Sequence, residues 1–185
     1  MVFYRVRSSF DTRRDRDLHP ILSFDDREAR FEWQEAVRKA TSEAEALAVQ
    51  AKFVLEWGGS RRQKEAGLSD WPSNLFAEPV CSQRLWARAR DLCDSIWWTP
   101  LPESKEAAAD EWGVLWRLPL VDLDSPQPSL PHLFKASHKR AAMLIIVSEA
   151  FKEKAEAGGL HGVEFTPFNA ELGRDKAGWR CFLEY

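Results

Sequence analysis

The chain has 185 residues, a length that suits one domain and is enough to bury its own hydrophobic core. Its formal net charge of −3 provides no general electrostatic field for nucleic acid. The N-terminal sequence shows no signal peptide, and the longest apolar run, AAMLIIV, is too short to cross a membrane. We therefore expect a soluble cytoplasmic protein that contacts neither membrane nor nucleic acid directly.

The first half of the chain begins with an alternating apolar pattern at 2–7, which predicts a strand. Residues 8–30 are polar and charged, and they favour a loop with little regular structure. Helix-forming residues in 31–50 predict one helix, placed in the second half of that range. The segment 52–57 reads as a strand that ends at Gly58 and Gly59.

The second half begins with a short strand at 75–80, after which Ser82 is placed to cap a helix. Apolar residues from Leu85 to Ile96 recur at helical spacing, so they predict the buried face of that helix. The remaining predicted elements are a strand at 96–99, a loop or single turn at 103–111, a long strand at 112–123 that bends near Pro119, a loop at 124–131, strands at 132–137 and 142–147, a helix after Ser148, a strand at 162–168 and a last strand at 178–185.

Two stretches of the sequence carry the same pattern. When 76–101 is aligned with 143–168, Ser82 falls on Ser148 and Leu85 on Phe151, and one inserted residue brings both Thr-Pro pairs into register. Each copy predicts a strand, a serine cap, an amphipathic helix and a returning strand. We therefore predict a single α+β domain, 1–185, with two helices packed on a mixed, mostly antiparallel sheet.

Residues suited to catalysis are sparse in this sequence. Three widely spaced cysteines with no CxxC pair argue against a disulfide framework and against a zinc site. Asp122 and Asp124, at i and i+2, form one alternative acid/base or metal-binding pair, and Cys81 before a helix is a second alternative as a nucleophile. Neither has an evident partner, so we predict no catalytic residue, no metal and no cofactor.

Residues 133–168, LFKASHKRAAMLIIVSEAFKEKAEAGGLHGVEFTPF, resemble the C-terminal signature of a bacterial immunity-protein family. The family is abundant in myxobacteria and belongs with the immunity proteins of polymorphic toxin systems. A related immunity family shares this pattern but is defined by paired CxxCG motifs, which are missing here together with any implied metal. The matching positions are Leu133, Phe134, Ile145, Ile146, Val147, Ser148, Phe151, Leu160, Gly162, Phe165 and Pro167.

The middle of the chain follows the same family order, with Asp70, Ser82, Pro100 and the run 114–124 at the expected places. The resemblance spans about residues 50–168 and leaves 1–50 as a divergent N-terminal extension. It implies a non-catalytic protein that binds and neutralises a cognate toxin domain, such as a nuclease, from a contact-dependent or secreted polymorphic toxin system. The alternatives are an adaptor or chaperone of a secretion system, and an enzyme that uses the residues named above.

Residues that contact such a partner are predicted only from the expected exposure of tryptophans and from acidic charge. Trp71 lies in a loop beside Pro72, and the adjacent Trp97 and Trp98 point to opposite faces of a strand. Acidic side chains near the long strand would suit a basic toxin. The predicted contact residues are Trp71, Trp97, Trp98, Asp110, Glu111, Asp122 and Asp124.

Overall fold

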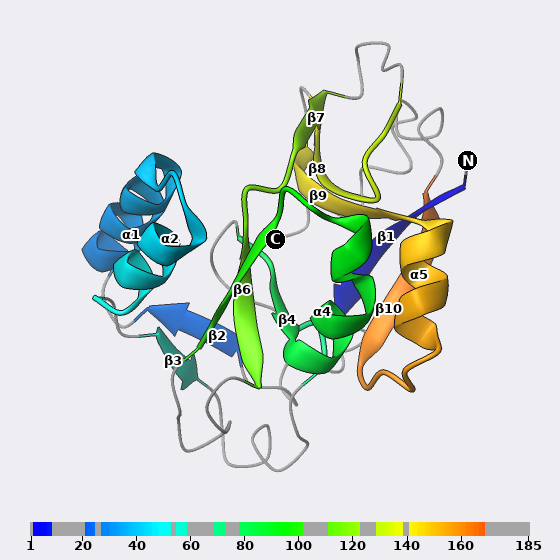
Figure 1. Cartoon of the computed structure of the whole chain (residues 1–185), viewed down its shortest axis with the longest axis horizontal. Helices are drawn as coiled ribbons and strands as arrows, with labels where there is room; N and C mark the ends of the chain where they lie inside the picture. The colour runs from blue at the N-terminus through cyan, green and yellow to red at the C-terminus, as the bar shows by residue number, and fades with distance from the viewer. Residues whose placement is uncertain are drawn as a thin grey trace.

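The computed structural model describes residues 2–8, 21–24, 27–52, 55–58, 69–72, 78–101, 111–122, 129–138 and 141–168. It confirms the α+β class, with helices packed on sheets that are mostly antiparallel (Figure 1). The predicted strand at 178–185 and most of the predicted loops at 103–111 and 124–131 lie outside these residues.

The first sheet is a split strand–helix–strand unit. Its two outer strands both pair antiparallel with the central strand, so the outer strands are parallel to each other. A helix connects them and extends into a short 3-10 turn, η2, at Arg90–Leu92. The elements are β4 (Val80–Ser82), α4 (Gln83–Ala89), β5 (Trp97–Pro100) and the central β6 (Trp112–Trp116).

The second sheet has five strands and contains a second unit of the same kind. The central strand of that unit, β1, comes from the N-terminus and lies between β9 and β10. The sheet continues through β8, which forms a hairpin with β9, to β7, which pairs parallel with β8. The elements are β1 (Phe3–Ser8), β7 (Leu120–Asp122), β8 (Leu133–His138), β9 (Ala141–Ser148), α5 (Glu149–Glu156) and β10 (Val163–Phe168).

The pairing register shows that the two units are equivalent residue by residue. In the first unit Gly113 pairs with Cys81 on one side and with Pro100 on the other. In the second unit Tyr4 pairs with Val147 and with Pro167. These neighbours are the residues before each serine cap and the prolines of each Thr-Pro pair, so the sequence repeat is a structural repeat. The central strand, however, follows the first copy along the chain and precedes the second.

The predicted long strand at 112–123 is two strands in two different sheets. β6 ends at Trp116, and β7 begins at Leu120 after Arg117, whose φ is +58°. A left-handed residue turns the chain sharply and cannot continue a strand. The predicted bend is therefore a crossing from the first sheet to the second, and it begins two residues before Pro119.

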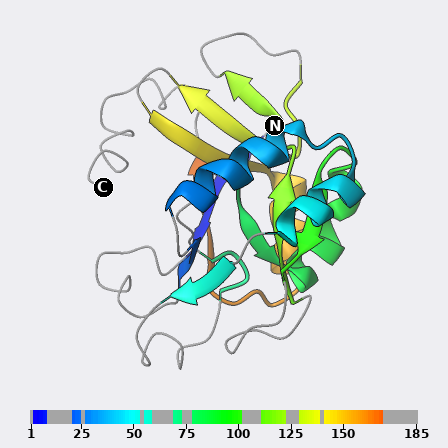
Figure 2. The ribbon, with the colours of Figure 1, turned by 90° about the vertical axis from the view of Figure 1, so that its left-hand side faces the viewer.

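The N-terminal region is more regular than its composition indicates, since β2 forms within the predicted loop at 8–30. Two helices stand where one was predicted, because the Ser42 side chain accepts a hydrogen bond from the Glu45 N–H and starts α2 anew. Figure 2 shows both helices packed in front of the sheets. The elements are β2 (Ile21–Phe24), α1 (Arg27–Lys39), α2 (Glu43–Gln50) and β3 (Leu55–Gly58), with β2 and β3 paired antiparallel.

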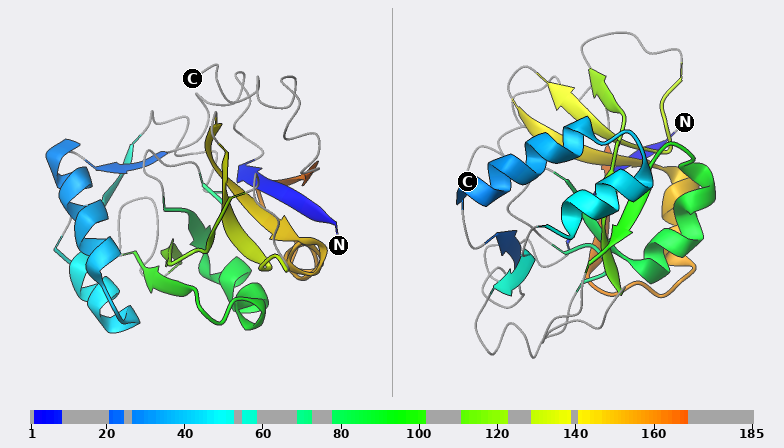
Figure 3. Two further views of the ribbon diagram at one scale, coloured as in Figure 1. Left: turned by 90° about the horizontal axis from the view of Figure 1, so that it is seen from above. Right: turned by 60° about the vertical axis from the view of Figure 1, so that its left-hand side comes forward.

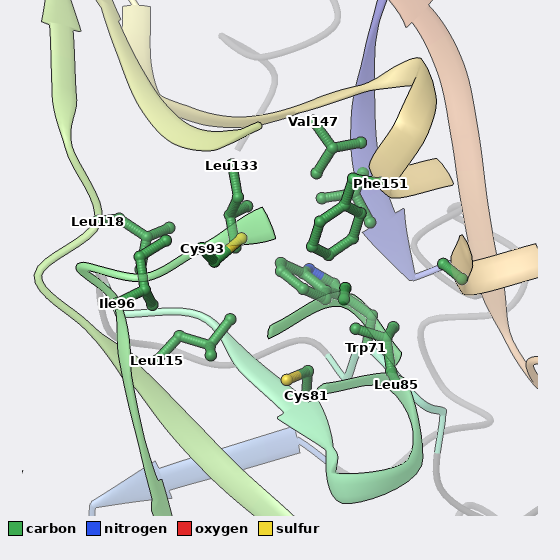
Figure 4. Close-up of a cluster of buried hydrophobic side chains, with 13 residues drawn as sticks. Trp71, Cys81, Leu85, Cys93, Ile96, Leu115, Leu118, Leu133, Val147 and Phe151 are labelled. Carbon is green, nitrogen blue, oxygen red and sulfur yellow. The ribbon is translucent and has the colours of Figure 1, made fainter. Parts of the chain in front are cut away.

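Alternating strand residues supply three hydrophobic clusters. Leu115 faces a central cluster that lies between the two sheets and also receives Leu85 of α4 and Phe151 of α5 (Figure 4). Trp116, the next residue, faces the opposite cluster beneath α1 and α2, where its ring lies 4.9 Å from that of Trp33. The third cluster, around Phe134 and Ile146, lies on the other face of the five-stranded sheet. The central cluster therefore joins both units into one core.

A buried hydrogen-bond chain attaches the N-terminal helices to the first sheet. Gln50 of α2 donates to the Pro100 carbonyl and accepts from the Thr99 hydroxyl at 2.5 Å. The Thr99 hydroxyl in turn accepts from the Trp116 indole N–H. Since each of these polar groups is satisfied by another, α2 packs on β5 without an uncompensated polar cost. The left panel of Figure 3 shows α1 and α2 at one side and α5 at the other.

Candidate functional site

Asp70 connects the two units through residues that are far apart in the sequence. Its carboxylate accepts hydrogen bonds from the Ser82 hydroxyl, from the Arg84 guanidinium on both oxygens, and from the His161 N–H at 2.7 Å. Its main chain donates to the His161 carbonyl and accepts from the Ser82 N–H, both at 2.9 Å. Neighbouring Ser69 donates to the Gly162 carbonyl at 2.6 Å. We call Ser69, Asp70, Ser82, Arg84 and His161 the Asp70 joint.

The electrostatics of this joint stabilise the charged carboxylate. The Asp70 side chain is 2% exposed, whereas that of Arg84 is 55% exposed. Burial by itself raises the pKa of Asp70, but the hydrogen bonds from Arg84, Ser82 and His161 outweigh it and hold the pKa below its usual value. Arg84 was not singled out from the sequence, because nothing local marks it as the partner of a residue fourteen positions earlier.

The second unit has an equivalent contact with different chemistry. Ser148 caps α5 as Ser82 caps α4, and each side-chain oxygen accepts from the N–H three residues later at 3.2 Å. The outer partner of Ser148 is His132, whose Nδ1 lies 2.7 Å from the hydroxyl and whose carbonyl accepts the Ser148 N–H. His132 therefore occupies the place that Asp70 occupies in the first unit.

The cysteine alternative is not favoured by its surroundings. Cys81 is buried in the central cluster between the sheets (Figure 4), and burial raises the pKa of its thiol well above the usual value. Burial likewise raises the pKa of Cys93 to about 12. A nucleophilic cysteine requires an accessible thiolate, and neither thiol meets that condition. Among the described residues no three His, Cys, Asp or Glu side chains gather as a metal site would require.

The predicted aromatic contact residues are placed differently from the expectation. Trp71 is 5% exposed and packs in the central cluster, so it is a core residue and not a surface anchor. Trp97 and Trp98 do point to opposite faces of β5, but both faces are covered. Trp98 packs against the central cluster, where it covers Gly113. Both side chains are half-buried, and Trp97 retains a surface contact described below.

The predicted acidic residues are spread over two sheets. Glu111 is exposed at the start of β6, where its carbonyl accepts the Gln83 N–H. Asp122 is exposed at the end of β7 in the five-stranded sheet. Asp110 and Asp124 lie outside the described residues. Glu111 and Asp122 therefore lie at opposite ends of the segment 111–122, which crosses from one sheet to the other.

The crossing between β6 and β7 presents an aromatic and cationic surface. The Arg117 guanidinium lies over the Trp97 ring, 4.7 Å from its centroid, and Arg117 is exposed. Among the described residues Arg117 is the one non-glycine residue with positive φ, a conformation that costs about 1 kcal/mol. Leu120, three residues later, is 61% exposed. We call Trp97, Arg117 and Leu120 the Trp97–Arg117 surface. Arg117 was not predicted as a contact residue, because sequence patterns do not reveal backbone angles.

Comparisons with family models, with curated proteins and with solved structures found nothing that matches this chain. Within the described part of the chain, no helix is long and apolar enough to pass through a bilayer.

Proposed function

We propose that this chain is an immunity protein, which binds and neutralises a cognate bacterial toxin domain in the cytoplasm without catalysing a reaction. The resemblance over residues 50–168 is the starting point. It rests on scattered positions, among them Asp70, Ser82 and Gly162. Scattered matches that arise by chance have no reason to meet in space, so their spatial arrangement bears on the proposal.

The observation that carries the proposal is the convergence of those positions at the Asp70 joint, which includes Asp70 and Ser82 and contacts Gly162. Asp70 binds the Ser82 hydroxyl, and Ser69 beside it binds the Gly162 carbonyl. Phe151, another matching position, is fully buried in the same cluster as Leu85 of the first unit. The shared pattern is therefore a set of positions that hold two units together, which leaves the outer surface open to change with each partner.

A protein of this build suits binding for physical reasons. The Asp70 joint, whose carboxylate is buried, ties the two units together, and a rigid surface loses little entropy when it binds. Interface anchors are commonly Trp and Arg side chains, and the crossing between the sheets presents both. The proposal therefore places recognition on the surface and assigns the repeated units to the scaffold.

Co-expression tests the proposal directly. The chain is produced together with the toxic domain encoded beside its gene, and survival and co-purification are scored. Survival with a stable complex is the expected result. Survival without a complex would instead favour an enzyme that acts on the target of the toxin, and death despite good expression of both proteins would overturn the proposal. An adaptor or chaperone would form a complex without rescuing the cells.

A further inference from the structure

Arg117 is a cation that is held in place without a counter-charge from the described residues. Arg117 lies over Trp97 but forms no ion pair or side-chain hydrogen bond with any residue that the structure describes. Lys152, which is stacked over Tyr4 in the described part of the chain, differs in this respect. Lys152 lies 3.1 Å from Glu156 and 3.7 Å from Glu149, so its charge is compensated within the chain. The guanidinium of Arg117 keeps its hydrogen-bond donors available to a partner.

The backbone conformation of Arg117 also indicates a site of contact. A left-handed conformation favours glycine or asparagine, which are the ordinary residues for such a turn. An arginine here is strained, and the stack on Trp97 holds its side chain in one place. Backbone strain of this kind is typical of sites where a side chain must be presented in a defined position.

Neighbouring side chains add apolar surface. Leu120 follows Arg117 by three residues and is the most exposed large hydrophobic side chain of the described residues. Trp97 is half-buried, with its inner side packed in the cluster beneath α1 and α2. Asp122, two residues after Leu120, already has an interaction of its own in the structure. An aromatic ring and an arginine are therefore in contact where the crossing from β6 to β7 begins, and an exposed leucine follows three residues later along the chain.

We propose that the Trp97–Arg117 surface is the contact site for an acidic segment of the toxin domain, whose carboxylate binds the Arg117 guanidinium. The stacked guanidinium presents paired N–H donors, which match a carboxylate in a bidentate arrangement. Apolar neighbours of that carboxylate would cover Leu120 and the exposed part of Trp97 and exclude water from the pair. The inference rests on the proposed function. It predicts an acidic contact segment on the toxin, whereas the acidic residues of the sequence predicted a basic toxin.

The test compares variants at position 117 in binding to a catalytically inactive form of the toxic domain encoded beside the gene. Arg117→Gly removes the cation and also relieves the backbone strain, so its urea midpoint should equal or exceed that of the unaltered chain. Its dissociation constant should rise about 30-fold or more. Arg117→Lys keeps the charge without the bidentate geometry, so its dissociation constant should lie between those of the unaltered chain and of Arg117→Gly. The matched control, Arg90→Gln, changes an exposed arginine of η2 and should bind normally.

Two results would overturn the inference. Equal affinity of the unaltered chain and of Arg117→Gly would show that the guanidinium does not contact the partner. A lower urea midpoint with unchanged affinity would show that the stack serves stability alone. Arg117→Asn, which also tolerates the left-handed conformation, supplies a second variant if the glycine chain folds poorly. Failure of the unaltered chain to bind the toxic domain would instead overturn the proposed function itself, and this inference with it.

Discussion

Ser82 and Ser148 occupy equivalent positions in the two units, and each caps its helix through a 3.2 Å hydrogen bond from the N–H three residues later. Their hydroxyls differ in the second partner, which is the buried carboxylate of Asp70 for Ser82 and the ring of His132 for Ser148. The same cap is therefore combined with an ionic contact in one unit and with an imidazole in the other.

This difference predicts unequal costs for removing the two caps. Ser148→Ala should lower the free energy of unfolding by about 1 kcal/mol, the usual value for an N-cap. Ser82→Ala should lower it by about 2 kcal/mol, since it also deprives the buried Asp70 of a donor. Urea unfolding measures both values. The control is Ser42→Ala, which removes the cap of α2 alone. Equal losses for Ser82→Ala and Ser148→Ala would contradict the role assigned to Asp70.

Replacing Asp70 should be among the most damaging single changes. Asp70→Ala leaves the Ser82 hydroxyl and the His161 N–H without their acceptor and removes the partner of Arg84. The free energy of unfolding should fall by about 3 kcal/mol, because two hydrogen-bond donors lose their acceptor, whereas the Arg84 side chain is 55% exposed and is solvated by water. Asp91→Ala, which breaks only the exposed contact with Lys154, is the control and should leave the urea midpoint nearly unchanged. Comparable losses in the two variants would refute a special role for the joint.

The depressed pKa of Asp70 predicts a specific response to acid. Because the pKa is lower in the folded chain than in the unfolded chain, the unfolded state takes up a proton first as the pH falls. The stability from this carboxylate is therefore present above about pH 4, the ordinary value for Asp, and is lost as the pH falls through the folded pKa. The stability difference between the unaltered chain and Asp70→Asn should shrink over that range. A difference that stays constant from pH 6 to pH 2.5 would contradict this assignment.

Gly113 and Trp98 form a close contact that predicts a non-additive pair. A Cβ at position 113 would lie 2.2 Å from Trp98 Cε2, so Gly113→Ala must displace the indole. We expect a loss of about 2 kcal/mol in the free energy of unfolding, typical of overpacking. In the Trp98→Phe background the same change should cost less, because a smaller ring vacates the space. Gly159→Ala is the control, since open space surrounds position 159 and only its φ of +61° opposes a side chain. Additive costs would disprove the contact.

Buried thiols predict slow chemical modification. Cys81 and Cys93 both have raised pKa values because burial disfavours the thiolate. In a Cys181→Ser chain at pH 8, a thiol reagent should label neither cysteine in the folded state and both in urea. The labelling rate in the folded state should then follow global unfolding. Rapid labelling of Cys81 in the folded chain would restore it as a candidate nucleophile.

Local features of this protein could be read from its sequence. The serine caps and the buried positions Leu85 and Phe151 depend on residues only a few positions apart. The two strands β8 and β9 were also predicted from two strand-forming runs, and the structure pairs them antiparallel. Likewise the alignment of the two copies predicted the structural equivalence, since each copy repeats the same local signals in the same order.

Other features were decided by contacts between distant parts of the chain. β6 and β1 are the central strands of their units, although β6 follows its unit along the chain and β1 precedes its own. Trp71 is enclosed by elements that the sequence does not place around it. The left-handed turn at Arg117 depends on two sheets that must be joined there. Strand pairing and burial of this kind gain their free energy only when distant segments meet. Local sequence determined the two strand–helix–strand copies and their caps, whereas only tertiary structure decided which strand lies at the centre of each unit, which tryptophan is buried and where the long strand breaks at Arg117.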